Sequence, residues 1–330
     1  MKNRLVLVTV AILLILSGCT NKKVEEKETP TSDQLLIYTT VYPLQYFTER
    51  IGGEFVDVQS IYPPGTDEHV FEPTQKDMMS LAKADLFFYI GLGLEGFVQK
   101  TEKTLQNENV RLVSIADDID PEELEPGHSH EGEAHEEEGH DTEHEEENHD
   151  GHDHDSTVDP HVWISPYIST LLAEKIKEEL SVELPEHADQ FQKNFETLYD
   201  ELEGLDRQFK TMADAAPNKT FFVSHDAFGY LAKTYGLQQL AVSGLDSQNE
   251  PSQKQLAELV HEAKEKKIHY ILFEQNVSSK LAEVIQKEIG AETMTLHNLS
   301  VLTEEDLDNK EDYFSLMEHN LQVLEKALSN

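Results

Sequence analysis

The stretch TFFVSHDAFGYLAKTY, residues 220–235, decides the fold, because it joins a strand pattern to a helix pattern. Residues 220–224 are mostly aromatic or β-branched and have the length of a strand. A strand inside a parallel sheet is buried on both faces, so it needs no alternation of polar and apolar residues. The stretch therefore predicts one strand–helix unit of an α/β sheet, with His225 at the carboxyl end of the strand.

The same rhythm of strand and helix occurs in both halves of the chain. Strands are expected at residues 35–41, 55–62, 86–90 and 110–115, and again at 220–224, 238–242, 268–273 and 292–296. Helices are expected at residues 43–51, 74–82, 227–235, 252–266, 279–289 and 312–328. Alternating strands and helices are typical of a parallel sheet with covered faces. We therefore predict an α/β protein of two similar lobes, each a four-stranded, mainly parallel sheet flanked by helices.

Two long amphipathic patterns, residues 166–180 and 185–215, lie between the halves. At about 1.5 Å per residue the second is long enough to span a small lobe, so it predicts a rigid connecting helix. The expected domains are an amino-terminal lobe at 34–184, the connecting helix at 185–217 and a carboxyl-terminal lobe at 218–330.

The first residues resemble an export signal. Lys2 and Arg4 precede an apolar run, which ends in the sequence Leu-Ser-Gly-Cys at Cys19. Small residues before a lone cysteine are similar to a bacterial lipobox, which predicts a signal peptide at 1–18 and a lipid on Cys19. The polar residues 19–33 are then a flexible tether to the membrane.

The net charge of −39 argues against nucleic acid and anionic membrane surfaces as partners, because clustered Lys and Arg bind phosphate backbones. An acidic tract with many histidines, within an expected disordered loop at 117–157, indicates instead an affinity for cations. Its histidines form an expected accessory metal-binding loop: His128, His130, His135, His140, His144, His149, His152 and His154.

Three histidines and a glutamate outside this tract are candidates for a metal site. They occur in DEHVFEP (His69), DPHVWIS (His161), VSHDAFGYL (His225) and FEQNVSS (Glu274). His225 and Glu274 end strands of the second lobe, and ligands bind α/β sheets beyond the carboxyl ends of the strands. The four side chains could therefore converge on one cation in a cleft between the lobes.

Imidazole and carboxylate ligands suit Zn²⁺, which four of them enclose tetrahedrally, whereas manganese favours more oxygen ligands. A closed shell of four ligands indicates that the metal is carried rather than used in catalysis. Asp67 and Glu68 precede His69 and could replace or supplement Glu274, and water is a further alternative for the fourth position.

Two other motifs have features of catalytic or cofactor-binding sites. The sequence GLGLEG at 91–96, with Asp117 and Asp118 downstream, satisfies a dinucleotide-binding pattern. It follows the third expected strand rather than the first, and an exported protein meets no cytoplasmic NAD pool, so a tight turn is favoured. The Ser224, His225 and Asp226 run lacks the nucleophile elbow of a serine hydrolase.

In this order, and with a His-rich loop before the second, the four metal-site motifs resemble those of the zinc-binding lipoprotein receptors of bacterial ABC importers, the ZnuA and AdcA type. The resemblance extends from about Leu35 to the carboxyl terminus. It implies zinc bound by His69, His161, His225 and Glu274, two α/β lobes joined by a long helix, and limited closure on metal binding. His225 favours zinc, because manganese receptors more often have a carboxylate there.

The resemblance also implies a monomer, anchored outside the membrane of a Gram-positive bacterium, that delivers zinc to a permease and its ATPase without catalysing a reaction. Three alternatives stay open from the residues: a manganese receptor of the same class, a zinc-dependent hydrolase with Glu274 as general base, and a surface adhesin or metal buffer built around the His-rich tract.

Overall fold

The computed structural model describes residues 34–124, 158–246, 251–276 and 279–329, and residues 35–330 group into one compact unit. The predicted signal peptide (1–18), tether (19–33) and lipid site at Cys19 lie outside the described residues, as do the eight histidines of the tract. Within the described part of the chain, no helix combines the length and apolar character needed to cross a membrane.

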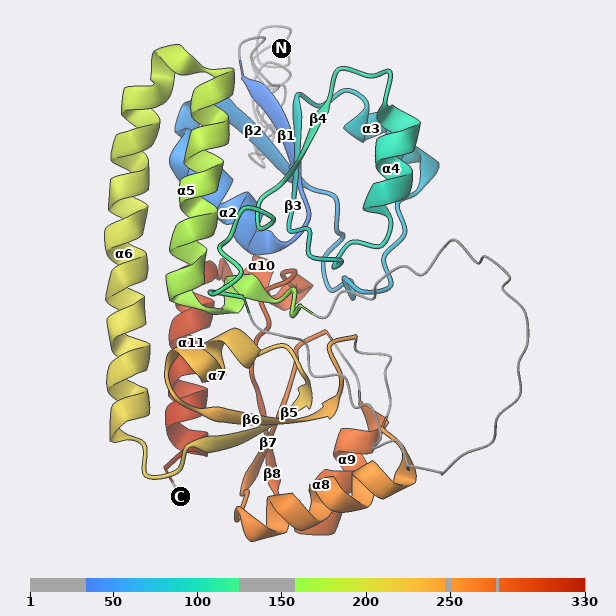
Figure 1. Ribbon diagram of the computed structural model, residues 1–330, viewed down its shortest axis with the longest axis vertical. Coiled ribbons are helices and arrows are strands. Elements are labelled where there is room, and N and C mark those ends of the chain that lie inside the picture. Colours follow the sequence, from blue (N-terminus) through green and yellow to red (C-terminus); the bar gives the residue numbers. More distant parts are fainter. Residues whose placement is uncertain (1–33, 125–157, 247–250, 277–278, 330) are drawn as a thin grey trace, which may run out of the picture. The chain divides into compact units, whose positions relative to one another are not determined.

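The first lobe contains a four-stranded parallel sheet in the order β2-β1-β3-β4 (Figure 1). Its strands are β1 (Leu35–Thr39), β2 (Val56–Ser60), β3 (Leu86–Tyr89) and β4 (Arg111–Ser114). Helix α2 (Tyr42–Gly52) packs on β1 and β2, whereas α3 (Gln75–Leu81) and α4 (Val98–Leu105) lie on the other side of the sheet. The crossovers place all four carboxyl ends at one edge.

The second lobe repeats this arrangement with the parallel order β6-β5-β7-β8. Its strands are β5 (Thr220–His225), β6 (Gln238–Ser243), β7 (Tyr270–Phe273) and β8 (Glu292–Thr295). Every residue of β5 is buried, as its continuous apolar run predicts. Phe222 packs among residues of α8 (Gln253–Glu265) and α9 (Lys280–Ile289), and its neighbours Phe221 and Val223 belong to the main core.

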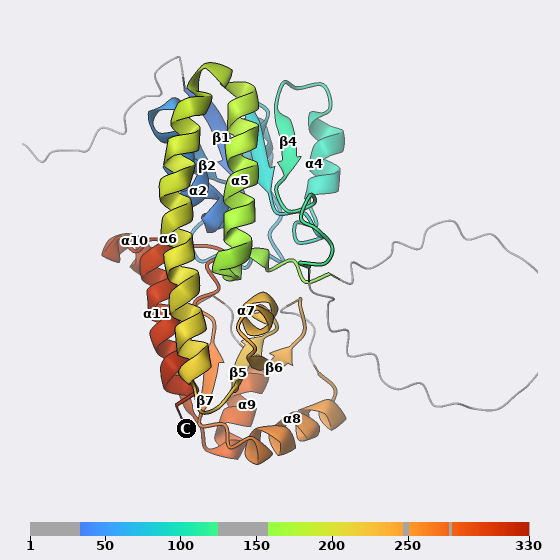
Figure 2. The same ribbon diagram turned by 60° about the vertical axis from the view of Figure 1, so that its left-hand side comes forward.

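A long helix, α6 (Ala188–Ala215), connects the lobes. It follows α5 (Pro166–Glu183) through one 3₁₀ turn at Pro185–His187 and packs against α2 and α5 of the first lobe. Farther along it packs against α11 (Tyr313–Ala327) of the second lobe, and both views show it running beside both sheets (Figures 1 and 2). Its 28 residues correspond to about 42 Å of helix.

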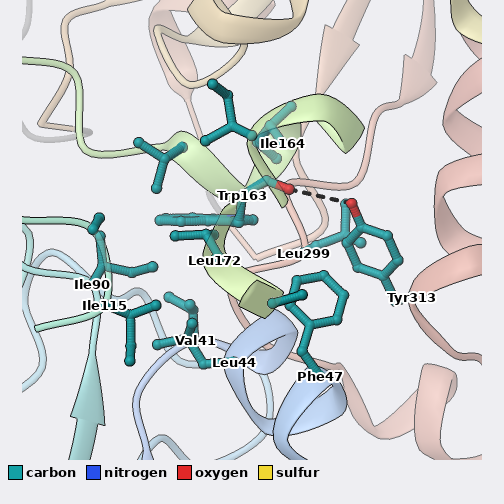
Figure 3. Close-up of a cluster of buried hydrophobic side chains, with 14 of the residues drawn as sticks. Val41, Leu44, Phe47, Ile90, Ile115, Trp163, Ile164, Leu172, Leu299 and Tyr313 are labelled. Carbon is teal, nitrogen blue, oxygen red and sulfur yellow. Dashed lines mark hydrogen bonds between the residues drawn. The ribbon is translucent and has the colours of Figure 1, made fainter. Parts of the chain in front are cut away.

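The core is continuous from one lobe to the other around Trp163 (Figure 3). This fully buried indole lies among Val41 and Leu44 of the first lobe and Leu299 of the second. The Tyr313 hydroxyl, from α11, donates to the main-chain oxygen of Trp163 at 3.5 Å. The segment that carries His161 is therefore held by apolar contacts with both lobes.

Several features differ in detail from the sequence expectations. Helices α4 and α10 (Glu304–Asn309) had no predicted range, and α7 (Gly229–Thr234) is shorter than the expected 227–235. Residues 117–124, assigned above to a disordered loop, are turns of the folded unit. Burial of Ile119 and an ion pair from Asp118 to Lys175 of α5, at 2.6 Å, hold this segment in place.

Candidate metal centre

Three histidines from separate segments of the chain meet where the carboxyl ends of the two sheets face each other. His225 is the last residue of β5, and His69 lies in the loop between β2 and α3. His161 immediately precedes the 3₁₀ turn Val162–Ile164. All three residues of this turn, Trp163 among them, are buried, and their packing fixes the backbone next to His161. Main-chain hydrogen bonds join the lobes beside these segments, such as Gly65 N–H, in the loop of His69, to the Leu302 oxygen at 2.9 Å.

The spacing of the three imidazoles fits a tetrahedral metal. Among the described residues, they form a group whose potential ligand atoms all lie within 4.8 Å of one another. The Nε2 atoms of His69 and His161 are 3.3 Å apart. Two ligands at the Zn–N distance of about 2.0 Å lie about 3.3 Å apart along the edge of a tetrahedron. Little movement of these two rings is therefore needed to bind Zn²⁺.

A carboxylate orients the ring of His161. Asp159 Oδ1 lies 2.7 Å from His161 Nδ1 and also accepts from the main-chain N–H of His161 at 2.9 Å. Tyr230 of α7 donates to the main-chain oxygen of Asp159 at 2.7 Å. A proton on Nδ1 leaves Nε2 with its lone pair toward His69, which is the tautomer that a metal ligand needs.

His225 has hydrogen-bond acceptors at both ring nitrogens. Its Nδ1 lies 3.0 Å from Glu274 Oε1, and its Nε2 lies 2.9 Å from the main-chain oxygen of Leu245. Burial opposes the charged form, but the Glu274 carboxylate and the Leu245 carbonyl outweigh it and raise the pKa of His225 to about 10. Without metal, His225 is therefore an imidazolium paired with Glu274.

The other two histidines are neutral. Burial, together with the neighbouring His161 and His225, lowers the pKa of His69 to about 3. Burial is also the first cause that holds the pKa of His161 well below its usual value. The triad therefore combines two neutral imidazoles with one that holds a proton.

Two buried carboxylates, Glu68 and Glu274, flank the triad, and one amide contacts both. Asn298 Nδ2 lies 2.6 Å from Glu274 Oε2 and 3.4 Å from Glu68 Oε1. Burial raises the pKa of Glu68 to about 7, and its Oε1 lies 4.0 Å from His69 Nε2. Asp67, the other alternative ligand, accepts from the main-chain N–H of His69 at 3.0 Å.

The structure thus brings together the three predicted histidines, whereas Glu274 contacts His225 and is outside the three-residue group. Asp159 and Asn298 were not assigned a role from the sequence. Asp159 had a local signal, since it stands two residues before His161 in DPH. Asn298 had none, because its contacts with Glu68 and Glu274 depend on how the lobes meet.

The two competing motifs have internal partners. In the glycine-rich turn, Glu95 accepts from the N–H groups of Ile90 and Gly91 at 2.8 and 3.1 Å, and Asp117 accepts from that of Leu92 at 3.4 Å. Carboxylates of the chain occupy donors that a dinucleotide phosphate would need. In the other motif, His225 contacts Glu274, and Ser224 Oγ is buried without a hydrogen-bond partner among the described residues.

Comparison with known proteins places this geometry in a family. The family model described as "ZnuA: Zinc-uptake complex component A periplasmic" matches residues 37–327. The zinc-binding lipoprotein AdcA of Streptococcus pneumoniae serotype 4 is 38% identical over 314 residues, which cover 95% of this chain and 58% of AdcA. The chain thus spans little more than half the length of this relative.

Another relative matches over nearly its full length, and one domain of AdcA matches over all of its own. The high-affinity zinc uptake system protein ZnuA of Bacillus subtilis strain 168 is 34% identical over 321 residues, which cover 97% of this chain and 96% of that protein. The crystal structure of the Zn(II)-bound ZnuA-like domain of Streptococcus pneumoniae AdcA aligns with a TM-score of 0.71 at 35% identity, covering 90% of this chain and 100% of that domain. With two four-stranded lobes, a long linking helix and a histidine triad between them, the chain belongs to the ZnuA family of zinc-uptake components.

Proposed function

We propose that the protein is an extracytoplasmic receptor that binds Zn²⁺ through His69, His161 and His225 and delivers it to an ABC importer. The observation that carries the proposal is the 3.3 Å separation of His69 Nε2 and His161 Nε2, which is the edge of a zinc tetrahedron. Glu274 is the proposed fourth ligand, because its Oε1 lies 3.0 Å from His225 Nδ1.

Binding follows from the protonation states of the ligands. The neutral His69 and His161 offer lone pairs at once, while His225 gives up a proton when zinc arrives. Zinc then replaces that proton as the positive charge beside Glu274, so the buried carboxylate keeps a counter-charge throughout. Release to the importer reverses the exchange.

The chemistry favours transport over catalysis and zinc over manganese. Three imidazoles and one carboxylate close a tetrahedral shell and leave no position for an activated water. Membership of an uptake family also argues against the hydrolase alternative. A nitrogen-rich ligand set suits zinc better than manganese, which prefers oxygen.

The proposed location and partners extend the family description. We place the mature chain outside the cytoplasmic membrane of a Gram-positive bacterium, held by a lipid on Cys19, the first residue of the tether 19–33. AdcA of Streptococcus pneumoniae is itself named a lipoprotein. The receptor is proposed to act as a monomer that docks on a permease, with an ATPase on the opposite membrane face. The proposed domains are 34–184, 185–217 and 218–330.

The His-rich tract is proposed as an accessory metal-binding loop. Its eight histidines, between His128 and His154, lie outside the described residues, whereas the triad is assembled without them. Ordering histidines of a polar tract around a metal costs conformational entropy, so each of these sites is expected to bind more weakly than the preassembled triad. Several weak sites would concentrate zinc near the receptor.

Calorimetric titration of the signal-free chain with Zn²⁺ tests the proposal. His225→Ala is expected to weaken the tight site by more than about 100-fold, because even indirect partners of a metal are worth 10–100-fold. His319→Ala, which removes an exposed histidine of α11, is the matched control and is expected to bind like the parent. If His225→Ala keeps the affinity of the parent, the proposed site is wrong.

Growth of a gene-deletion strain under zinc chelation separates uptake from adhesion. A zinc receptor predicts a growth defect that added zinc repairs and added manganese does not. Normal growth combined with a loss of surface attachment would instead favour the adhesin alternative.

A further inference from the structure

We propose that Asn298 is a specificity-determining residue, which keeps Glu274 a one-oxygen ligand and so restricts the site to four-coordinate metals. This inference rests on the proposed function and concerns a residue outside the proposed ligand set. Asn298 is fully buried three residues after the end of β8, and its amide contacts both carboxylates that flank the triad.

The orientation of the Asn298 amide is fixed by its partners. Its Oδ1 accepts from the main-chain N–H of Ser300 at 3.0 Å and from Gln275 Nε2 at 2.7 Å. A main-chain N–H can only donate, so the oxygen must face that side and Nδ2 must face the carboxylates. The Trp163 indole donates to the main-chain oxygen of Asn298 at 2.7 Å and holds the backbone of this residue in place.

The amide occupies one oxygen of each flanking carboxylate. Nδ2 lies 2.6 Å from Glu274 Oε2, which leaves Oε1 on the side of His225. Nδ2 also lies 3.4 Å from Glu68 Oε1, the oxygen that is 4.0 Å from His69 Nε2. Ser300 donates to the other Glu68 oxygen at 2.8 Å, so both oxygens of this carboxylate already have a donor.

The number of available oxygens determines which metals the site satisfies. Three imidazoles and one carboxylate oxygen give the tetrahedral shell that zinc accepts. Manganese favours more oxygen ligands, which a bidentate Glu274 or an approaching Glu68 would supply. Donors on Glu274 Oε2 and Glu68 Oε1 disfavour both arrangements, so selectivity arises partly by penalising the competing metal.

Competition titrations with Zn²⁺ and Mn²⁺, together with the absorption spectrum of the Co²⁺ form, test this role. In Asn298→Ala the amide is removed, and zinc affinity is expected to fall about 10–100-fold, as for other residues that orient metal ligands. Manganese affinity is expected to hold or rise, so the zinc-to-manganese ratio falls at least tenfold. The Co²⁺ form is expected to lose the intense visible bands of four-coordinate cobalt.

Asn320→Ala is the matched control. Asn320 is another fully buried asparagine of the second lobe, and it hydrogen-bonds the main-chain N–H and oxygen of His297, next to Asn298. This variant loosens the same segment but retains the Asn298 amide, so it should keep the metal ratio and the Co²⁺ spectrum of the parent. Equal shifts in both variants would mean that general loosening, not the amide, sets the selectivity.

Further outcomes separate this inference from the proposed function. Asn298→Ser, whose hydroxyl can donate to one carboxylate only, is expected to give an intermediate ratio and serves if the alanine variant does not fold. A five- or six-coordinate Co²⁺ spectrum in the parent overturns the role of Asn298 without any variant. Tight zinc binding by the parent, with an unchanged metal ratio in the folded variants, overturns it and leaves the receptor function intact.

Discussion

At the scale of single residues, the metal-free site pairs a protonated His225 with the Glu274 carboxylate and keeps the other two histidines neutral. His225 has its two nitrogens on Glu274 and Leu245, and its pKa is raised to about 10 by these partners. His69 and His161 are held neutral, chiefly by burial. Among the three histidines, the proton is therefore located on His225, and in the proposed function zinc displaces it.

These protonation states predict the pH dependence of zinc affinity. Between pH 6 and 8, His225 is protonated and the other two histidines are not, so binding should release one proton from His225. Glu68, whose pKa burial raises to about 7, adds up to one more proton toward pH 6. The association constant should therefore rise about tenfold per pH unit near pH 8 and more steeply near pH 6. Calorimetry in buffers of different ionisation enthalpy measures the proton count directly.

Two other outcomes would contradict this assignment. Solvated histidines with a pKa of about 6.5 would give an affinity that levels off above pH 7. Release of three protons near pH 6 would mean that His69 or His161 is also charged, because His225 and Glu68 together account for two at most. The same titration of Glu274→Gln should show a smaller release, because the carboxylate that favours the protonated form of His225 is gone.

Among the predicted site residues, His225 and Glu274 could be placed by strand ends, whereas His161 was indicated by its motif DPHVWIS. His225 and Glu274 follow apolar runs that end at the same sheet edge, so their convergence follows from parallel topology. Asn298 was not predicted because its role requires the approach of Glu68, which is 230 residues distant in the chain. Contacts of that kind leave no local pattern.

At the scale of elements, apolar periodicity accounts for most of the fold. All eight predicted strands are present, and α6 buries apolar residues at helical spacing along its length: Phe191, Phe195, Leu198, Leu202, Leu205 and Phe209. Helix α10 was not predicted because its six residues include a single apolar one, Leu307, which is exposed. Its capping box, Thr303 with Asp306, was the available signal.

Substitutions of two glycines test how backbone conformation contributes to the stability of the helices. Gly204 lies within α6, where an added Cβ meets Arg207 Nη2 at an ordinary 3.8 Å. Gly204→Ala is therefore expected to raise the free energy of unfolding by about 0.5–1 kcal/mol, because alanine loses less backbone entropy in a helix. Denaturant melts of the metal-free protein measure this change.

Gly290 provides the opposite case. It ends α9 in the left-handed region at φ 72°, with no atom within 4 Å of an added Cβ. Gly290→Ala is therefore expected to lower the free energy of unfolding by about 1 kcal/mol through backbone strain alone. Both variants should keep the zinc affinity of the parent, and changes of the same sign in both would contradict the account.

At the scale of the whole molecule, the unit at residues 35–330 holds its site through a shared core. Trp163 contacts both lobes (Figure 3). Asn276 Nδ2, from the segment after β7, donates to the main-chain oxygen of Thr66 at 2.9 Å. A wide separation of the lobes would expose this core and break these bonds. We therefore expect zinc to enter and leave through small movements near His69 and Leu245.

For the whole chain, we predict that the triad binds one zinc ion tightly and that the His-rich tract binds further ions weakly. Deletion of residues 128–155 is expected to lower the number of zinc ions bound while leaving one tight site, because the triad is assembled from described residues alone. Calorimetry or equilibrium dialysis with Zn²⁺ measures both quantities. Loss of the tight site on deletion would place the main site in the tract.

The most direct test of the central claim is anomalous diffraction at the zinc absorption edge, from crystals of the full signal-free chain with one equivalent of Zn²⁺. The account predicts one strong peak within about 2.2 Å of a nitrogen of each of His69, His161 and His225. A peak on the histidines of the tract, or one that touches fewer than three members of the triad, would contradict it.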